Sequence, residues 1–319
     1  MAFSLRLLRV FLAVARHRSF TRAAGELGLT QPAVSRAVRE LESQTRATLL
    51  DRTPAGVRLT EAGSALLTHA RVIFAETRAA EEDLDALAGL AQGTLRIGAS
   101  PTIATYVVPP MLHAYHTRYP GVELRLVTAP SRVVARLLFE REVDIALVET
   151  PVDDDRLSAR VWAEDTLVIV AAPTHTLAGR SDLTPAAIAQ ELFVIREPGS
   201  GTHRLVLRAL RSHGVVPHRR LEVDSTEAIT QIVAAGLGTA IVSRCAAADP
   251  LALGRLVILD VPGLAIRRPF TRLALAGVEI SAAATAFESM IVAPLRATSG
   301  ARTKARGARN AGRVLGRRS

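Results

Sequence analysis

The chain has 319 residues, of which 49% are hydrophobic, and it carries a formal net charge of +10. This hydrophobic content excludes a disordered chain, and the length allows two or three domains. Neither a membrane span of roughly 18 apolar residues nor a signal-peptide pattern is present, and the single cysteine, Cys245, excludes an intrachain disulfide. We therefore expect a cytoplasmic protein with a half-buried, unreactive Cys245.

The first 45 residues predict three helices. An amphipathic helix near residues 5–14 can pack beneath a second helix, which Ser19 or Thr21 can cap. Gly28 and Leu29 form a short turn before a third helix, which Thr30 can cap. This order of elements is typical of a helix-turn-helix.

The third helix has two different sides. Val34, Val38 and Leu41 recur at helical spacing and are expected to face the core. The opposite side carries polar and basic groups of the kind that bind base edges and phosphates. The DNA-binding residues predicted in and around this helix are Arg22, Thr30, Gln31, Pro32, Ser35, Arg36 and Arg39. The alternative is a solvated face of an ordinary helical bundle.

The distribution of charge favours DNA binding. Residues 1–60 have a net charge of +6 and residues 296–319 a net charge of +8, which leaves a net charge of −4 for residues 61–295. A basic head on a mildly acidic body is the pattern expected of a DNA-binding module attached to another domain.

A winged segment completes the head. TRAAGELGLTQPAVSRAVRELE, followed by LLDRTPAGVRLTEAG, resembles the N-terminal signature of LysR-type transcriptional regulators. The wing departs from the family because Pro54-Ala55-Gly56 has no basic residue where the family usually carries one. Arg52 and Arg58 flank the wing, and we expect them to contact phosphate.

The segment from Glu61 to about Leu90 predicts one long helix. Leu66, Ala70, Ile73, Thr77, Ala80, Leu84 and Leu87 alternate spacings of four and three, as in the seam of a short coiled coil. The alternative is an amphipathic helix lying on its own domain. The resemblance implies a dimerisation helix and therefore a homodimer or homotetramer.

Strand-like and helix-like segments alternate after Gly93 and predict a mainly parallel sheet flanked by helices. Crossovers near Trp162 and Pro269 would join two lobes, similar to the effector domain of the family and to type II periplasmic binding proteins. The predicted fold is thus α/β with an all-α head. Its domains are a winged helix-turn-helix (1–60), a linker helix (61–92), an effector domain (93–295; lobe I 93–162 and 269–295, lobe II 163–268) and a basic disordered tail (296–319).

Three strand-to-helix turns carry hydroxyl groups that could bind an anion in the cleft. Helix N-termini attract anions through free N–H groups and the helix dipole. The candidate effector-binding residues are Ser100, Pro101, Thr102, Ser200, Gly201, Thr202 and Thr226, with Thr128 added from its resemblance to a family cleft position. The alternative is that these Ser and Thr residues are ordinary helix caps.

The predicted function is that of a sequence-specific transcriptional regulator that responds to a small anionic metabolite. We expect no enzymatic activity, no metal and no cofactor, and the resemblance implies double-stranded DNA and RNA polymerase as partners. The run Arg196–Thr202 is similar to members that govern carbon or sulphur assimilation. The competing interpretation is a solute-binding or enzymatic α/β body whose fused helical head binds a protein partner.

Overall fold

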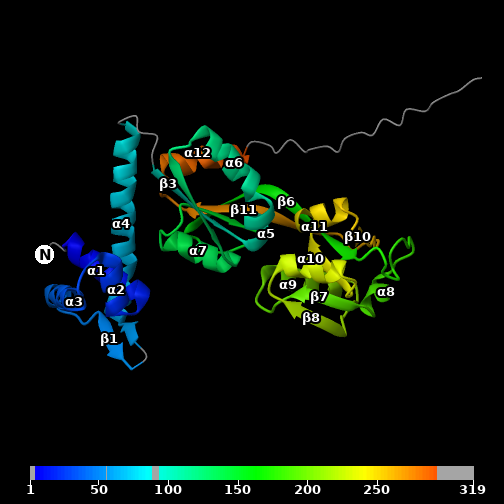
Figure 1. The fold of residues 1–319 in the computed structure, drawn as a ribbon, viewed down its shortest axis with the longest axis horizontal. Coiled ribbons are helices and arrows are strands. Elements are labelled where there is room, and N and C mark those ends of the chain that lie inside the picture. Colours follow the sequence, from blue (N-terminus) through cyan, green and yellow to red (C-terminus); the bar gives the residue numbers. More distant parts are fainter. Residues whose placement is uncertain (1–3, 55, 88–92, 293–319) are drawn as a thin grey trace, which may run out of the picture.

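The computed structural model describes residues 4–54, 56–87 and 93–292, which form a helical head, one long helix and an α/β domain with two lobes (Figure 1). Figure 1 shows the head and the long helix at the left, with the two lobes following one another to the right. Among the described residues, none of the helices is long and apolar enough to cross a membrane.

The head consists of three helices and a hairpin. Its elements are α1 (Leu5–His17), α2 (Phe20–Leu27), α3 (Gln31–Thr45), β1 (Leu50–Thr53) and β2 (Gly56–Leu59). Ser19, and not Thr21, caps α2 by accepting a hydrogen bond from the Arg22 N–H at 3.3 Å. Gly28 follows α2 with a φ of 64°, a left-handed conformation that glycine adopts at little cost. The Thr30 side chain caps α3 through the Ala33 N–H at 3.4 Å.

The long helix α4 (Glu61–Leu87) contacts the head through its first half. Ala70 is buried in the head core, and Leu66 and Ile73 pack against the same core. Leu84, further along the predicted seam, is 67% exposed. The first half of α4 therefore lies on its own head, as the alternative interpretation predicts, whereas Leu84 is available to a partner.

The α/β domain is built on one nine-stranded mixed sheet with the order β4-β3-β5-β11-β6-β9-β7-β8, and β10 pairs with β6. Its strands are β3 (Gly93–Ala99), β4 (Val122–Thr128), β5 (Ile145–Val148), β6 (Leu157–Ala171), β7 (Leu192–Arg196), β8 (Arg219–Val223), β9 (Thr239–Ser243), β10 (Val257–Ile258) and β11 (Ile266–Leu275). The long strands β6 and β11 pair antiparallel and connect the two lobes. The sheet is therefore mixed and not mainly parallel, because these crossover strands run against their neighbours.

Helices cover both faces of the sheet in each lobe. They are α5 (Pro101–Tyr106), α6 (Val108–Arg118), α7 (Ser131–Phe139), α8 (Pro185–Ala189), α9 (Gly201–Ser212), α10 (Thr226–Ala234), α11 (Arg244–Ala252) and α12 (Ala282–Val292). In the first lobe, α5, α6 and α12 pack on one face and α7 on the other. In the second lobe, α8 and α9 oppose α10 and α11. Each lobe thus has two hydrophobic layers, one on each side of the sheet.

Candidate DNA interface and effector cleft

The exposed side of α3 carries most of the predicted DNA-binding residues. Arg36, Arg39 and Pro32 are exposed, and Gln31 at the start of the helix is half-buried. Arg22 and Thr30 are exposed just before it, and Arg58 is exposed on β2 of the wing. Ala55, at the tip of the wing, lies outside the described residues. The basic side chains therefore extend from one helix and the adjacent hairpin.

Ser35 does not face outward as predicted. Its exposure is only 6%, because the guanidinium of Arg52 covers it and donates a hydrogen bond from Nη2 to Ser35 Oγ at 2.8 Å. The same guanidinium lies 4.4 Å from the centre of the Phe20 ring, a distance suited to a cation–π contact. Arg52 thus connects the wing to α2 and α3 and fixes the position of the hairpin.

A buried guanidinium, that of Arg268, lies where the two lobes meet. Arg268 on β11 is directly opposite Asp165 on β6, and its Nε donates to Asp165 Oδ2 at 2.8 Å. Its Nη2 is 2.8 Å from the same oxygen. Asp165 Oδ1 also accepts from Ser243 Oγ at 2.8 Å. Because Arg268 and Asp165 are 4% and 2% exposed, they form a fully buried ion pair on the crossover strands.

Residues from both lobes converge on Arg268. Its Nη2 donates to Thr102 Oγ1 on α5 at 3.3 Å, and its Nη1 donates to Thr202 Oγ1 on α9 at 2.9 Å. Glu149, which follows β5, brings a second carboxylate to within 3.3 Å of Nη1. Thr102 and Thr202, which are about a hundred positions apart in the chain, therefore share one guanidinium.

The serines at the three strand-to-helix turns differ in whether their side chains cap the helix. Ser100 precedes α5 and Ser200 precedes α9, and both are buried. Neither side chain caps its helix. The Ser100 Oγ has no hydrogen-bond partner among the described residues. Ser225, by contrast, accepts from the Ala228 N–H as an ordinary cap. The simple capping interpretation therefore holds for Ser225 and fails for Ser100 and Ser200.

Four predicted positions remain to be placed. Pro101 and Gly201, both half-buried, begin α5 and α9. Thr226 accepts a hydrogen bond from Arg196 Nη1 at 3.2 Å, and Thr128 is exposed at the end of β4, opposite Ala99. Within the described part of the chain, no hydrogen bond joins Thr226 or Thr128 to Arg268. The cluster around Arg268 is thus narrower than the predicted set.

Sequence reasoning missed the charged residues of this cluster, Arg268, Asp165 and Glu149, and also Arg196, which bonds to Thr226 outside it. Residues 266–272 were not predicted as a strand, and Pro269 with two adjacent arginines is not typical of one. The alternation of Ile266, Arg268 and Phe270 on the buried side, with Arg267 exposed, is the signal that could have placed Arg268 inward.

Cys245 lies near this cluster but is exposed, which corrects the expectation of a half-buried thiol. Desolvation and the negative charge of Asp165 raise the pKa of Cys245 above its usual value. The protonated thiol is therefore favoured, which lowers its reactivity as a nucleophile.

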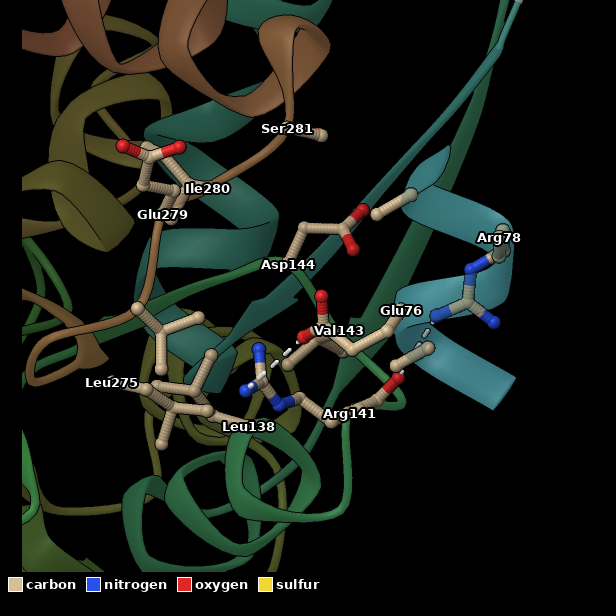
Figure 2. A pocket seen from close by; sticks show the side chains of 13 residues that line it. Glu76, Arg78, Leu138, Arg141, Val143, Asp144, Leu275, Glu279, Ile280 and Ser281 are labelled. Atoms are coloured by element: carbon tan, nitrogen blue, oxygen red, sulfur yellow. Dashed lines mark hydrogen bonds and ion pairs between the residues drawn. The ribbon is translucent and has the colours of Figure 1, made fainter. Parts of the chain in front are cut away.

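A separate cavity of about 70 Å³ lies between α4 and the first lobe, away from the lobe junction (Figure 2). Glu76 of α4 pairs with Arg141 at 3.7 Å, and Arg78 Nη2 donates to the Arg141 carbonyl oxygen at 3.2 Å. Arg71 pairs with Glu140 at 2.7 Å next to it. Polar contacts thus fasten α4 to the loop after α7.

Two family models match the chain. The model of bacterial regulatory helix-turn-helix proteins of the lysR family matches residues 5–64, and the LysR substrate binding domain matches residues 88–295. The regulator CbbR of Rhodospirillum rubrum is 39% identical over 292 residues, which cover 92% of this chain and 97% of that protein. The RuBisCO operon transcriptional regulator of Allochromatium vinosum is 38% identical and covers 92% and 96%.

Solved structures of regulatory proteins resemble this chain, either in the effector domain or over most of its length. The regulatory domain of CcmR from Synechocystis PCC6803, in complex with 2-PG, has a TM-score of 0.60 and 30% identity and covers 65% of this chain and 99% of that one. A full-length variant of OxyR from Pseudomonas aeruginosa has a TM-score of 0.70 and covers 92% of this chain and 94% of that one. At 20% identity, OxyR supports the fold alone.

Proposed function

This chain belongs to the family of LysR-type transcriptional regulators, and we propose that it controls a RuBisCO operon in response to a phosphorylated carboxylate. It is a DNA-binding transcriptional regulator with an effector-binding domain. The proposed target rests on relatives of 35–39% identity, among them proteins named as regulators of the RuBisCO operon. The proposed effector class rests on the CcmR domain, which was solved with 2-PG (2-phosphoglycolate).

The DNA-binding part of the proposal assigns base and phosphate contacts to the exposed side of α3 and to the wing. We assign base-edge contacts to Arg36 and Arg39 and phosphate contacts to Arg22 and Arg58, and the exposure of all four side chains supports this assignment. Two heads on one dimer would read two half-sites one or more helical turns apart. Contact with RNA polymerase belongs to the same proposal and rests on the family resemblance.

The effector part is carried by one observation, the buried guanidinium of Arg268 between the lobes. The residues that surround it supply hydroxyl groups from both lobes, and Thr202 lies in the first turn of α9, where free N–H groups favour an anion. Charge-assisted hydrogen bonds to a carboxylate or phosphate are roughly twice as strong as neutral ones. An anion bound there would contact both lobes and could change the angle between them.

Residues 61–295 have a net charge of −4, so the overall electrostatic field of this part of the chain cannot attract an anion. Local donors must therefore supply the affinity. A ligand that binds two lobe arrangements with different affinities shifts their populations, and paired heads would transmit the shift to the DNA.

An enzymatic body with a protein-binding head is the competing interpretation. The relatives are named transcriptional regulators, which favours the regulator. A footprint on the promoter region of a RuBisCO operon separates the two interpretations. Protection of a palindromic site supports the regulator, and turnover of 2-phosphoglycolate without protection would contradict it.

The effector site is tested by Thr102→Val and Thr202→Val, which keep side-chain size and remove the hydroxyl groups bonded to Arg268. Both variants should bind the promoter without effector as the wild type does, and should lose the change in footprint caused by 2-phosphoglycolate. Ser225→Ala is a matched control, because Ser225 caps α10 and is not bonded to Arg268. A wild-type response in both valine variants would contradict the site.

A further inference from the structure

The carboxylate of Glu149 lies in the middle of the donors to which the effector site has been assigned. Its Oε1 accepts a hydrogen bond from Thr202 Oγ1 at 3.5 Å and lies 3.3 Å from Arg268 Nη1. The side chain is 6% exposed. Glu149 comes from the first lobe and Thr202 from the second, so this contact crosses the lobe junction.

Acceptors of the protein surround the Arg268 guanidinium. An arginine side chain has five N–H donors. Nε donates to Asp165, Nη1 to Thr202 and Nη2 to Thr102, and the carboxylates of Glu149 and Asp165 lie 3.3 Å from Nη1 and 2.8 Å from Nη2 as ion pairs. The Thr202 hydroxyl accepts from Arg268 and so gives its one proton to Glu149. An anion entering the cluster therefore meets donors that already face the carboxylates of Glu149 and Asp165.

The two carboxylates beside Arg268 are not equivalent. Asp165 uses both oxygens, one on Arg268 and one on Ser243. Glu149 uses only Oε1, and its Oε2 is buried without a hydrogen-bond partner among the described residues. A buried polar atom without a partner costs free energy, especially when it carries charge. Glu149 is therefore the carboxylate that can leave Arg268 at the lower cost.

The residues that follow β5 contact the second lobe at the start of α9. Glu149 follows β5 and belongs to a bend together with Thr150. Thr150 touches the start of α9, since a Cβ atom at Gly201 would lie 1.9 Å from Thr150 Oγ1. A second contact across the junction is the Tyr106 hydroxyl, which donates to Glu227 Oε2 at 2.7 Å. The lobes are thus held together by the contacts of the protein itself.

We propose that Glu149 is an internal anion that occupies the place of the effector, and that an anionic effector acts by displacing it from Thr202 and Arg268. This inference rests on the proposed effector site and adds its regulation. Displacement exchanges one carboxylate for another anion at the same donors. It also releases the bend at Thr150 from the start of α9, which gives the lobe junction two alternative arrangements.

The test is Glu149→Gln in the full-length protein, which removes the charge and keeps the shape. Calorimetric titration with 2-phosphoglycolate should show at least about tenfold tighter binding to this variant than to the wild type. Glu164→Gln is the matched control, because Glu164 is exposed on β6 next to Asp165 and pairs with Arg267 at 3.2 Å. Its affinity should stay within about twofold of the wild type.

Glu149→Asp provides a second measurement if the glutamine variant folds poorly. It retains the charge but shortens the side chain by one methylene, so the carboxylate reaches Thr202 and Arg268 less well, and binding should again be tighter. Equal or weaker binding of 2-phosphoglycolate by both folded variants would overturn the inference while leaving the effector site intact. If neither the wild type nor the variants bind 2-phosphoglycolate or inorganic phosphate, both the effector site and this inference are wrong.

Discussion

Some arginines of this chain hold elements of the protein together, whereas others are exposed on the predicted DNA-binding surface. Arg52 and Arg268 have their guanidinium groups bonded to other side chains, and each connects elements that are distant in the sequence. Arg36 and Arg39 extend from the exposed side of α3. Planar guanidinium groups suit both tasks, because they can bind several acceptors or a base edge in fixed geometry.

Replacing Arg36 or Arg39 by alanine should weaken specific DNA binding without affecting the fold. Each lost base or phosphate contact should cost about 1–3 kcal/mol of binding free energy. The measurement is a gel-shift titration on the promoter together with thermal unfolding. Arg160→Ala is a control, since Arg160 is exposed on β6 of the effector domain. Wild-type affinity in a folded double variant of Arg36 and Arg39 would refute the assignment of α3 as the recognition helix.

Ser35 should influence DNA binding through Arg52. Ser35→Ala removes the acceptor of the Arg52 Nη2 bond, and Arg52→Ala removes the donor, so each change breaks the same contact between α3 and the wing. Each should reduce the free energy of unfolding of the head by about 1 kcal/mol. A double-mutant cycle on DNA affinity should show strongly non-additive effects. Additive effects would mean that Ser35 and Arg52 contact DNA independently.

At the scale of elements, amphipathic helices and buried strands could be predicted because their periodicity is local. The helix-turn-helix is an example, since its caps at Ser19 and Thr30 and its glycine turn depend on neighbouring residues only. The segment between β3 and β4 forms two helices, α5 and α6, separated at Val107. Pro109 and Pro110 explain the break, because a proline cannot donate the N–H that would continue the first helix.

The elements that could not be predicted from the sequence depend on contacts between residues far apart in the chain. The first half of β6, residues 157–165, is mostly exposed and is stabilised as a strand by pairing with β11 about a hundred residues later. The helix α11 contains Pro250 near its end, which predicts a break when only the local sequence is considered. The Arg268 cluster was missed for the same reason, since its five members come from β11, β6, α5, α9 and the residue after β5.

The linker helix α4 offers a prediction that separates its two halves. Leu84→Asp places a charge on an exposed position of the predicted seam, so it should dissociate the proposed dimer while leaving the melting temperature of the head unchanged. Leu66→Asp should instead lower that melting temperature, because Leu66 packs against the head core. Sedimentation of the variants at micromolar concentration is the measurement. A Leu84→Asp variant that remains dimeric would place the self-association elsewhere.

At the scale of the whole molecule, α4 and polar contacts near the cavity of Figure 2 connect the head to the effector domain. Arg141 pairs with Glu76 at this cavity. Arg71, earlier on α4, pairs with Glu140 and Glu142. These contacts join α4 to the lobe that also carries Glu149 and Thr102. If effector binding moves this lobe as proposed, these contacts would pass the movement to α4, which shares a core with the head.

The charge of the whole molecule leads to a prediction about salt dependence. Residues 296–319 lie outside the described residues, but their balance of +8 exceeds that of the head. A basic segment that neutralises phosphates releases counterions, and the slope of log affinity against log salt concentration falls by about 0.9 for each phosphate. Deleting residues 296–319 should therefore make the slope shallower and leave the preferred site unchanged. Replacing the eight basic residues by glutamine is the matched control and should have the same effect. An unchanged slope in both variants would mean that the segment does not bind DNA.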